Sequence, residues 1–200
     1  WRDQIRSVAR YSIEGSTLCT GTLIMDVPGS FRPFFLSAAH CEVNADNAPS
    51  IVVYWNYEAP QCGQPRAATL TQNQTGAMFR AARAAVDMLL VELDDVPDPA
   101  FHVFYSGWDR SGAIPQGSVG IHHPSGHVKS ISINDDPLRT SNTCFGNSDI
   151  DTHWRVNNWE LGTTESGSSG SGLWDIQTKQ LVGFLSNGTA ACSNRSGFDC

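Results

Sequence analysis

The stretch Gly167-Ser168-Ser169-Gly170-Ser171-Gly172 lies near the C-terminal end of the sequence, and Ser37-Ala38-Ala39-His40-Cys41 lies far upstream, directly after an apolar run. Glycine lets a backbone turn sharply and direct several N–H groups at one point. A serine hydroxyl becomes a good nucleophile only with a base nearby and with donors for the oxyanion that its attack creates. Each stretch alone also fits a flexible loop or a buried histidine, but together they predict Ser169 as a nucleophile and His40 as its base.

The composition predicts an all-β protein. Of 200 residues, 18 are glycine and 10 are proline, and only 16% are charged. Such a composition favours many short strands joined by turns over long helices. The segments that combine β-branched or aromatic residues with flanking turn residues are 17–24, 34–38, 51–57, 88–93, 103–108, 119–122, 128–133 and 181–185. This many short strands indicates β-barrels or a β-sandwich.

Two other segments bear on the domain organisation. Residues 77–86 are rich in alanine and arginine, which favour helix, although a strand leading into Asp87 is equally consistent with them. Residues 94–99 contain two prolines and three aspartates, so they fit neither the interior of a helix nor a central strand. We therefore expect a link near the midpoint, with one domain in residues 1–96 and a second in residues 97–200.

Charge and cysteine content point to an extracellular protein. The formal net charge is −7 and no cluster of lysine and arginine is present, which argues against nucleic-acid binding. Six cysteines, none of them in a CxxC pair, suggest disulfides formed in an oxidising compartment. No run approaches the roughly 18 apolar residues of a membrane helix. The sequence opens on Trp1, so we expect that a leader, and with it a pro-segment, has been removed.

Asp87 is a candidate third member of the site. It precedes the apolar run 88–91, which places a carboxylate at the mouth of a buried strand. An acid in that position is costly without a partner, and the second ring nitrogen of a histidine is a suitable one. The competing acids Asp94, Asp95 and Asp98 lie in the proline-containing link, where a solvated surface role is expected.

The order His40, Asp87, Ser169 and the residues around each of them resemble the chymotrypsin-type serine endopeptidases. The similarity is greater to the secreted bacterial lysyl endopeptidases, because it extends to residues 2–6, 19–23, 50–57, 107–110 and 121–124 and so covers nearly the whole chain. The order of the motifs also argues against an α/β-hydrolase, in which the nucleophile comes first. Ser171, moreover, occupies the second glycine position of the GxSxG pattern.

The resemblance implies two antiparallel six-stranded β-barrels with a catalytic cleft between them. It implies that Ser169 attacks the scissile carbonyl of a peptide or protein substrate, that His40 transfers its proton and that Asp87 fixes the imidazole tautomer. The amides of Gly167 and Ser169 would bind the oxyanion. No cofactor or metal is implied, and a monomer is the default expectation. The sequence ends at Cys200, before the last strand and helix usual in this fold, so we expect a shortened second barrel.

The resemblance also implies a disulfide between Cys19 and Cys41 beside the histidine. The relatives of two further cysteines bond to cysteines in an N-terminal extension that this sequence lacks, so the remaining four allow three connectivities. We expect Cys62 to pair with Cys144, and Cys192 with Cys200.

The specificity pocket departs from the family pattern. In lysyl endopeptidases an aspartate that follows Asn-Arg-Ser pairs the substrate ammonium, but here Gly197 follows residues 194–196, and the other pocket-base position, Thr163, is uncharged too. Asp199 could take over the role, because an alternating strand places it on the same face as Gly197. Alternatively, an apolar or polar side chain enters a pocket lined by Thr163, Thr164 and Gly197. We prefer the second hypothesis, with broad specificity.

Three further departures concern the cleft. A family histidine aligns with Ser186, which is followed by Asn187 as another expected substrate contact, and a family tryptophan aligns with Phe145. Ser168 replaces the aspartate that receives a new N-terminal amine in mammalian digestive relatives, so activation by that salt bridge is not expected. A catalytically silent binding protein on the same fold is the rival hypothesis.

One remaining histidine cluster has another possible role. His122, His123 and His127 could suggest a metal site, but no carboxylate stands at ligand spacing, and we expect structural histidines.

Overall fold

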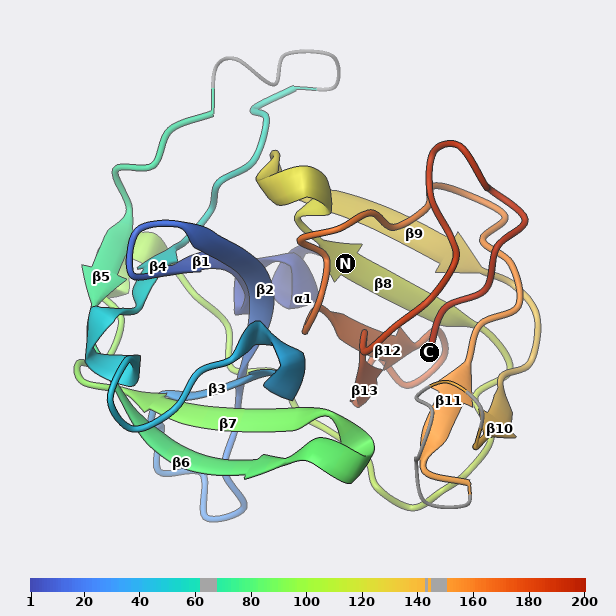
Figure 1. Cartoon of the computed structure of the whole chain (residues 1–200), viewed down its shortest axis with the longest axis horizontal. Coiled ribbons are helices and arrows are strands. Elements are labelled where there is room, and N and C mark those ends of the chain that lie inside the picture. Colours follow the sequence, from blue (N-terminus) through green and yellow to red (C-terminus); the bar gives the residue numbers. More distant parts are fainter. Residues whose placement is uncertain (62–67, 143, 145–150) are drawn as a thin grey trace.

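The computed structural model describes residues 1–61, 68–142, 144 and 151–200. It contains two antiparallel systems of strands lying side by side, one from each half of the chain (Figure 1). The prediction of an all-β fold is confirmed. In the described part of the chain, no helix is long and apolar enough to cross a membrane.

The N-terminal half forms one seven-stranded sheet with the order β5-β4-β1-β2-β3-β7-β6. Every neighbouring pair in it is antiparallel. The strands are β1 (Val8–Ile13), β2 (Thr17–Ile24), β3 (Phe34–Ala38), β4 (Val52–Tyr54), β5 (Asn73–Thr75), β6 (Ala77–Arg83) and β7 (Met88–Leu93).

Gly76 closes this sheet. It lies between β5 and β6, the two edge strands, and has a φ of +89°, a conformation that glycine adopts readily. Its N–H donates to the carbonyl of Ile51 at 2.8 Å, and its own carbonyl accepts from the amide of Asp94 at 3.2 Å. The segment from β5 to β6 is therefore one bent strand that pairs on both sides, and the sheet becomes a six-stranded barrel.

Aromatic side chains fill this first barrel. Phe35 meets Tyr11 edge to face with ring centroids 5.7 Å apart, and it meets Trp55 in the same way at 5.9 Å. All three are almost fully buried. Gly21 faces the ring of Phe35, and a Cβ at that position would overlap it. A large ring opposite a glycine lets the barrel pack without a void.

The C-terminal half divides its strands between two sheets. The larger has the order β13-β12-β8-β9, and β10 pairs with β11. Single bridges, Ile133 to Leu161 and Val156 to Asp199, connect the irregular segments between them. The strands are β8 (Ser118–His122), β9 (Ser130–Asn134), β10 (Arg139–Ser141), β11 (His153–Arg155), β12 (Gly172–Asp175) and β13 (Leu181–Phe184).

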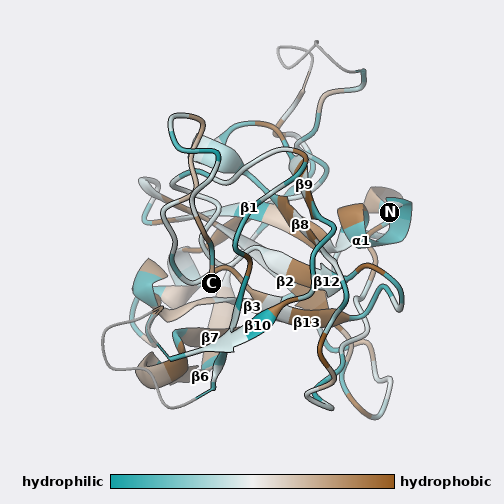
Figure 2. Cartoon of the chain, turned by 90° about the vertical axis from the view of Figure 1, so that its right-hand side faces the viewer, coloured by the Kyte–Doolittle hydropathy of each residue, from teal (hydrophilic) through white to brown (hydrophobic). Residues whose placement is uncertain are grey.

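A short helix, α1 (Arg2–Ser7), precedes the first strand and was not predicted. Trp1 and Ile5 pack against the second core, around Val8, Ile121 and Trp174. Helix and N-terminus lie on a different side of the molecule from the C-terminus, and α1 has mixed polar and apolar colouring (Figure 2). The N-terminal residues thereby pack against the four-stranded sheet of the C-terminal half, although they belong to the first half of the chain.

The predicted strands 17–24, 34–38 and 88–93 have the bounds observed for β2, β3 and β7. Residues 77–83 form β6 rather than a helix, and a 3₁₀ turn, η4 (Ala84–Val86), follows, because pairing with β7 outweighs the helix propensity of alanine. Residues 103–108 form no strand. Only Ser106 and Trp108 make isolated parallel bridges there, within the long connection between the two halves.

Candidate active site

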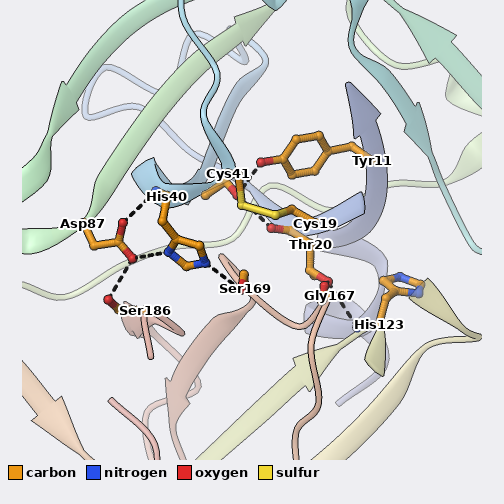
Figure 3. The surroundings of a disulfide bond; sticks show 11 residues. Tyr11, Cys19, Thr20, His40, Cys41, Asp87, His123, Gly167, Ser169 and Ser186 are labelled. Atoms are coloured by element: carbon orange, nitrogen blue, oxygen red, sulfur yellow. Dashed lines mark hydrogen bonds and ion pairs between the residues drawn. A yellow bond between two sulfur atoms is a disulfide. The ribbon is translucent and has the colours of Figure 1, made fainter. Parts of the chain in front are cut away.

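His40 and Asp87 are brought together by neighbouring strands. His40 lies in the 3₁₀ turn η1 (Ala39–Cys41) directly after β3, and Asp87 lies directly before β7. These strands pair antiparallel with Ala38 opposite Met88, which places the end of one beside the start of the other. The backbone N–H of His40 donates to Asp87 Oδ1 at 2.8 Å, and His40 Nδ1 lies 2.6 Å from Asp87 Oδ2 (Figure 3).

Ser169 completes this chain of hydrogen bonds from the other half of the molecule. His40 Nε2 lies 2.7 Å from Ser169 Oγ (Figure 3). Because the carboxylate of Asp87 only accepts, Nδ1 of His40 carries a hydrogen, and Nε2 is left to accept from the serine hydroxyl. The backbone also fixes the serine, since the amide of Thr20 donates to the Ser169 carbonyl at 2.9 Å.

Asp87 is 2% exposed and fully engaged. Ser186, expected to contact substrate, donates its hydroxyl to Asp87 Oδ2 at 2.7 Å, in addition to the two contacts with His40. Asp87 also has a φ of +53°, in the left-handed region that few non-glycine residues occupy. Backbone strain of this kind persists where the surroundings hold a residue firmly. The carboxylate is therefore held in one orientation toward His40.

A disulfide joins Cys19 in β2 to Cys41 in η1, with their Cα atoms 6.5 Å apart. This is the pair that the sequence resemblance implied. Both cysteines are buried, and Cys41 belongs to the same turn as His40. A cross-link next to His40 limits how far its turn can move, which keeps the imidazole in place.

The loop before Ser169 leaves two backbone amides available. Within the part of the chain that the structure describes, the N–H groups of Gly167 and Ser169 donate to no protein acceptor. The carbonyl of Ser166 accepts from the Ser125 amide at 2.6 Å, and the carbonyl of Ser168 accepts from the Ser171 amide at 3.0 Å. In a trans peptide the N–H points opposite to the C=O, so both unpaired amides point away from the supporting structure.

His122 supports this loop from below. It is fully buried, and its ring nitrogens lie 2.8 Å from Ser168 Oγ and 3.0 Å from Ser132 Oγ. Burial lowers the pKa of His122 to about 4. His123 is buried as well, and its Nδ1 donates to the carbonyl of His127 at 2.9 Å. His122 thereby connects β8 to the loop that carries Ser169.

The low pKa of His122 makes the protein sensitive to acid. The unfolded chain takes up a proton near pH 6.5, whereas the folded chain does so only near pH 4, so the stability from the neutral ring is lost as the pH falls through this window. Between pH 7 and 4.5 this amounts to about 2 to 3 kcal/mol. We expect His122→Gln to reduce the pH dependence of the urea unfolding free energy by that amount. A pH dependence in His122→Gln equal to that of the wild type would contradict the prediction.

A hollow of about 530 Å³ opens beside His40 and Ser169. Four of the expected substrate-binding residues line it: Thr164, Ser186, Asn187 and Asp199. Thr163 and Gly197 do not. The remaining expected residue, Phe145, lies outside the described residues. Residues that the sequence analysis did not single out, among them Glu165 and Thr189, also line the hollow.

The structure has a turn at Gly197, where the sequence analysis expected an alternating strand. The amide of Gly197 closes this turn onto the carbonyl of Asn194 at 3.0 Å, and a Cβ there would collide with the backbone of Thr189. A period of two does not apply in a turn, so the expectation that Gly197 lines the pocket is wrong for a local reason. The uncharged residue at this position therefore does not determine the charge of the hollow.

Asp199 is the buried acid of the hollow. It is 2% exposed, and its Oδ2 accepts from Trp159 Nε1 and Thr164 Oγ1, both at 2.7 Å. Its backbone pairs with Gly188 and Val156, which fixes its position in the wall. Burial raises the pKa of Asp199, and the two donors lower it in part. A carboxylate whose burial disfavours its charge is one that gains from a cationic partner.

The expected pairing of the other cysteines is corrected. Cys144 bonds to Cys200, with Cα atoms 5.8 Å apart, in place of the Cys62–Cys144 and Cys192–Cys200 pairs. The side chain of Asn187 donates to the carbonyl of Cys144 at 3.0 Å while its backbone pairs with Cys200, which brings the two cysteines together. Cys192 is exposed and makes no disulfide among the described residues. Cys62 lies outside them.

Solved structures with the same fold include proteases. The active form of the Rv3671c protease from Mycobacterium tuberculosis matches with a TM-score of 0.60 and 15% identity, over 98% of this chain and 75% of that one. A Glu endopeptidase matches with a TM-score of 0.60 and 19% identity, over 98% of this chain and 83% of that one.

The family is narrower than the fold. Residues 1–199 match the family described as "Lysyl endopeptidase, C-terminal domain", and the chain belongs to it. The lysyl endopeptidase of Pseudomonas aeruginosa is 35% identical in an alignment of 189 residues that covers 89% of this chain. The chain spans 38% of the length of that relative.

Proposed function

We propose that the protein is an extracellular serine endopeptidase that hydrolyses peptide bonds through an acyl-enzyme. Ser169 Oγ attacks the scissile carbonyl carbon while its proton passes to His40 Nε2, and the oxyanion that forms accepts from the amides of Gly167 and Ser169. His40 then gives the proton to the leaving amine, and the C–N bond breaks. A water repeats the sequence on the acyl-enzyme, with His40 again as base, and releases the new carboxylic acid.

The observation that carries the proposal is the continuous chain from Asp87 through His40 to Ser169, with links of 2.6 and 2.7 Å. Heavy-atom distances in this range are those that proton transfer to a general base requires. The unpaired amides of Gly167 and Ser169 add the donors that acyl transfer needs. The family match, and the disulfides expected of an oxidising compartment, support an extracellular peptidase.

We also propose that the enzyme cleaves after lysine, in contrast to our preference from sequence. Asp199 lines the hollow next to the nucleophile, where its carboxylate accepts from Trp159, Thr164 and the backbone of Ala190. A Cβ at Gly188 would overlap Oδ1, so the absence of a side chain there leaves room beside the carboxylate. The name of the Pseudomonas aeruginosa relative, a lysyl endopeptidase, agrees with this proposal.

Covalent labelling tests the endopeptidase function. A fluorophosphonate probe should label the folded protein at Ser169, as mapped by mass spectrometry, and a peptide library should yield fragments that end predominantly in lysine. Prior denaturation should abolish labelling, because the activation of Ser169 depends on His40. A natively folded protein that is neither labelled nor active would instead support a silent binding protein on the same fold.

Asp199→Asn tests the specificity. Asparagine has nearly the same shape and can still accept from Trp159 and Thr164, so the fold should survive while the charge is lost. An unpaired buried ammonium costs about 3 to 5 kcal/mol, so kcat/KM for a lysine substrate should fall about 10²- to 10⁴-fold. When glutamine replaces lysine before the scissile bond, the variant should cleave the peptide at about the same rate as the wild type does. If wild type and variant have the same ratio of lysine to glutamine cleavage, Asp199 does not select lysine.

A further inference from the structure

The peptide bond between Ser166 and Gly167 determines whether the oxyanion site exists. The Ser166 carbonyl accepts from Ser125, and the N–H of the same planar peptide therefore points the other way. A half-turn of this peptide would direct a carbonyl instead of a donor at the oxyanion. Gly167 has a φ of +86° and lacks a side chain to resist such a turn. Contacts outside the loop must hold the peptide in its productive orientation.

One set of contacts comes from residues 123–127, which follow β8 and include the 3₁₀ turn η6 (Pro124–Gly126). We call this segment the 123–127 turn. It is closed by the Gly126 amide on the His123 carbonyl, and Ser125 has a left-handed φ of +52°. A non-glycine residue in this region costs of order 1 kcal/mol or more, so neighbouring contacts must stabilise it. A Cβ on Gly167 would lie 3.0 Å from Gly126 N, so loop and turn touch directly.

Arg10, on β1 of the first barrel, holds the turn from outside. Its Nη1 donates to the carbonyl of Gly126 at 2.6 Å, across 116 positions of sequence. Its guanidinium carbon lies 5.1 Å from the ring centroids of both Tyr54 and Tyr57, within the range of cation–π attraction. Tyr57 in turn stacks on His123 at 6.1 Å with the planes 17° apart. Arg10 thus contacts the 123–127 turn directly at Gly126, and through Tyr57 it contacts the turn at His123.

Thr20 ties the same loop to the first barrel on its other side. Its hydroxyl donates to the carbonyl of Gly167 at 2.8 Å and accepts from the His123 amide at 3.2 Å (Figure 3). Ser168 engages His122 and provides no carboxylate that could pair with a chain terminus. Besides the contact of Ser168 with His122, the hydrogen bonds that orient the oxyanion loop therefore include those to Thr20 of the first barrel and to the 123–127 turn.

We propose that Arg10 is a positioning residue for the oxyanion site. It fixes the 123–127 turn, the Ser125 amide of the turn holds the Ser166 carbonyl, and the Gly167 amide is thereby kept toward the reacting carbonyl. This inference rests on the proposed endopeptidase function. It assigns to a side chain of the first barrel the control of a donor in the second. Loss of Arg10 should reduce the fraction of molecules that have a complete oxyanion site. Because only those molecules react efficiently, kcat should fall in proportion to that fraction.

Arg10→Met tests this role, because methionine keeps much of the length and apolar contact but removes the donors and the charge. The loss of an oxyanion donor costs about 10²- to 10³-fold in kcat, so a partial loss should lower kcat about 10- to 100-fold with KM within about twofold. A peptide aldehyde, whose adduct with Ser169 forms an oxyanion, should bind more weakly by a similar factor. The matching peptide alcohol, which forms none, should bind as to wild type.

Two other variants keep the test decisive. Arg10→Lys retains a charge and a donor and should recover part of the lost kcat and aldehyde affinity, and it replaces Arg10→Met if that variant does not fold. Arg139→Met, at an exposed arginine of β10, should behave as wild type. Unchanged kcat in an active protein, or aldehyde and alcohol binding weakened equally, would overturn the role of Arg10 alone. Absence of turnover in the wild type would contradict the proposed function and, with it, this inference.

Discussion

Replacing Ser169 with alanine is expected to lower kcat about 10⁵- to 10⁶-fold, the largest effect of any single change in this protein. The variant lacks the atom that forms the acyl-enzyme, and His40, 2.7 Å away, then has only water to activate. KM should change little, because the hollow that receives the substrate side chain is intact. Initial rates with a fluorogenic peptide over a wide range of enzyme concentration measure the change.

The matched control is Ser16→Ala, in the exposed turn between β1 and β2, which removes the same hydroxyl away from the cleft. It should retain wild-type kcat, while Ser169→Ala also loses labelling by a fluorophosphonate. Both variants should unfold within about 0.5 kcal/mol of wild type, as surface changes usually do. If Ser169→Ala keeps more than about a hundredth of the wild-type turnover, Ser169 is not the nucleophile.

The contacts of His40, Asp87 and Ser169 could be expected from sequence because each residue has a distinctive local context. His40 follows an apolar strand and precedes a cysteine, Asp87 precedes a run of buried aliphatic residues, and Ser169 is flanked by glycines. β3 and β7 are neighbours in one sheet, and their pairing brings His40 and Asp87 together. The local contexts can be read from the sequence, whereas the pairing of β3 with β7, which are far apart in the chain, was implied only by the resemblance to a known family.

The residues that line the hollow could not be predicted from the sequence in the same way, because the lining depends on contacts between distant segments. Gly197 and Asp199 differ by two positions, yet a turn at residues 194–197 leaves only Asp199 in the wall. Cys144 meets Cys200 because Asn187 contacts both, a relation with no local signal. Arg10 and Gly126 are joined by one hydrogen bond across the two halves. The sequence indicated the contacts among His40, Asp87 and Ser169 better than the residues that surround them.

Asp87→Asn is the second change with a very large expected effect, and it separates orientation from acidity. An amide has nearly the shape of the carboxylate, and its oxygen can still accept from the backbone N–H of His40, while Ser186 Oγ can accept from its NH₂ group. Its NH₂ group then faces His40 Nδ1, which currently lies 2.6 Å from Asp87 Oδ2. Since NH₂ can only donate, it favours the tautomer with hydrogen on Nε2, which cannot take the proton of Ser169. We expect kcat to fall about 10⁴-fold near neutral pH with KM little changed.

Ser186→Ala provides the comparison that identifies the cause. It removes one donor to the same Oδ2 atom, at 2.7 Å, but leaves the charge of Asp87 and both contacts with His40 in place. Its kcat should fall less than about tenfold, because a hydrogen bond to a charged group contributes about 1.5 to 3 kcal/mol and only part of that changes between ground and transition state. If Asp87→Asn and Ser186→Ala lowered kcat equally, the carboxylate would serve the packing of the site and not the tautomer of His40. A much larger effect of Asp87→Asn, with fluorophosphonate labelling slowed by the same factor, means that the negative charge beside Nδ1 prepares His40 to activate Ser169.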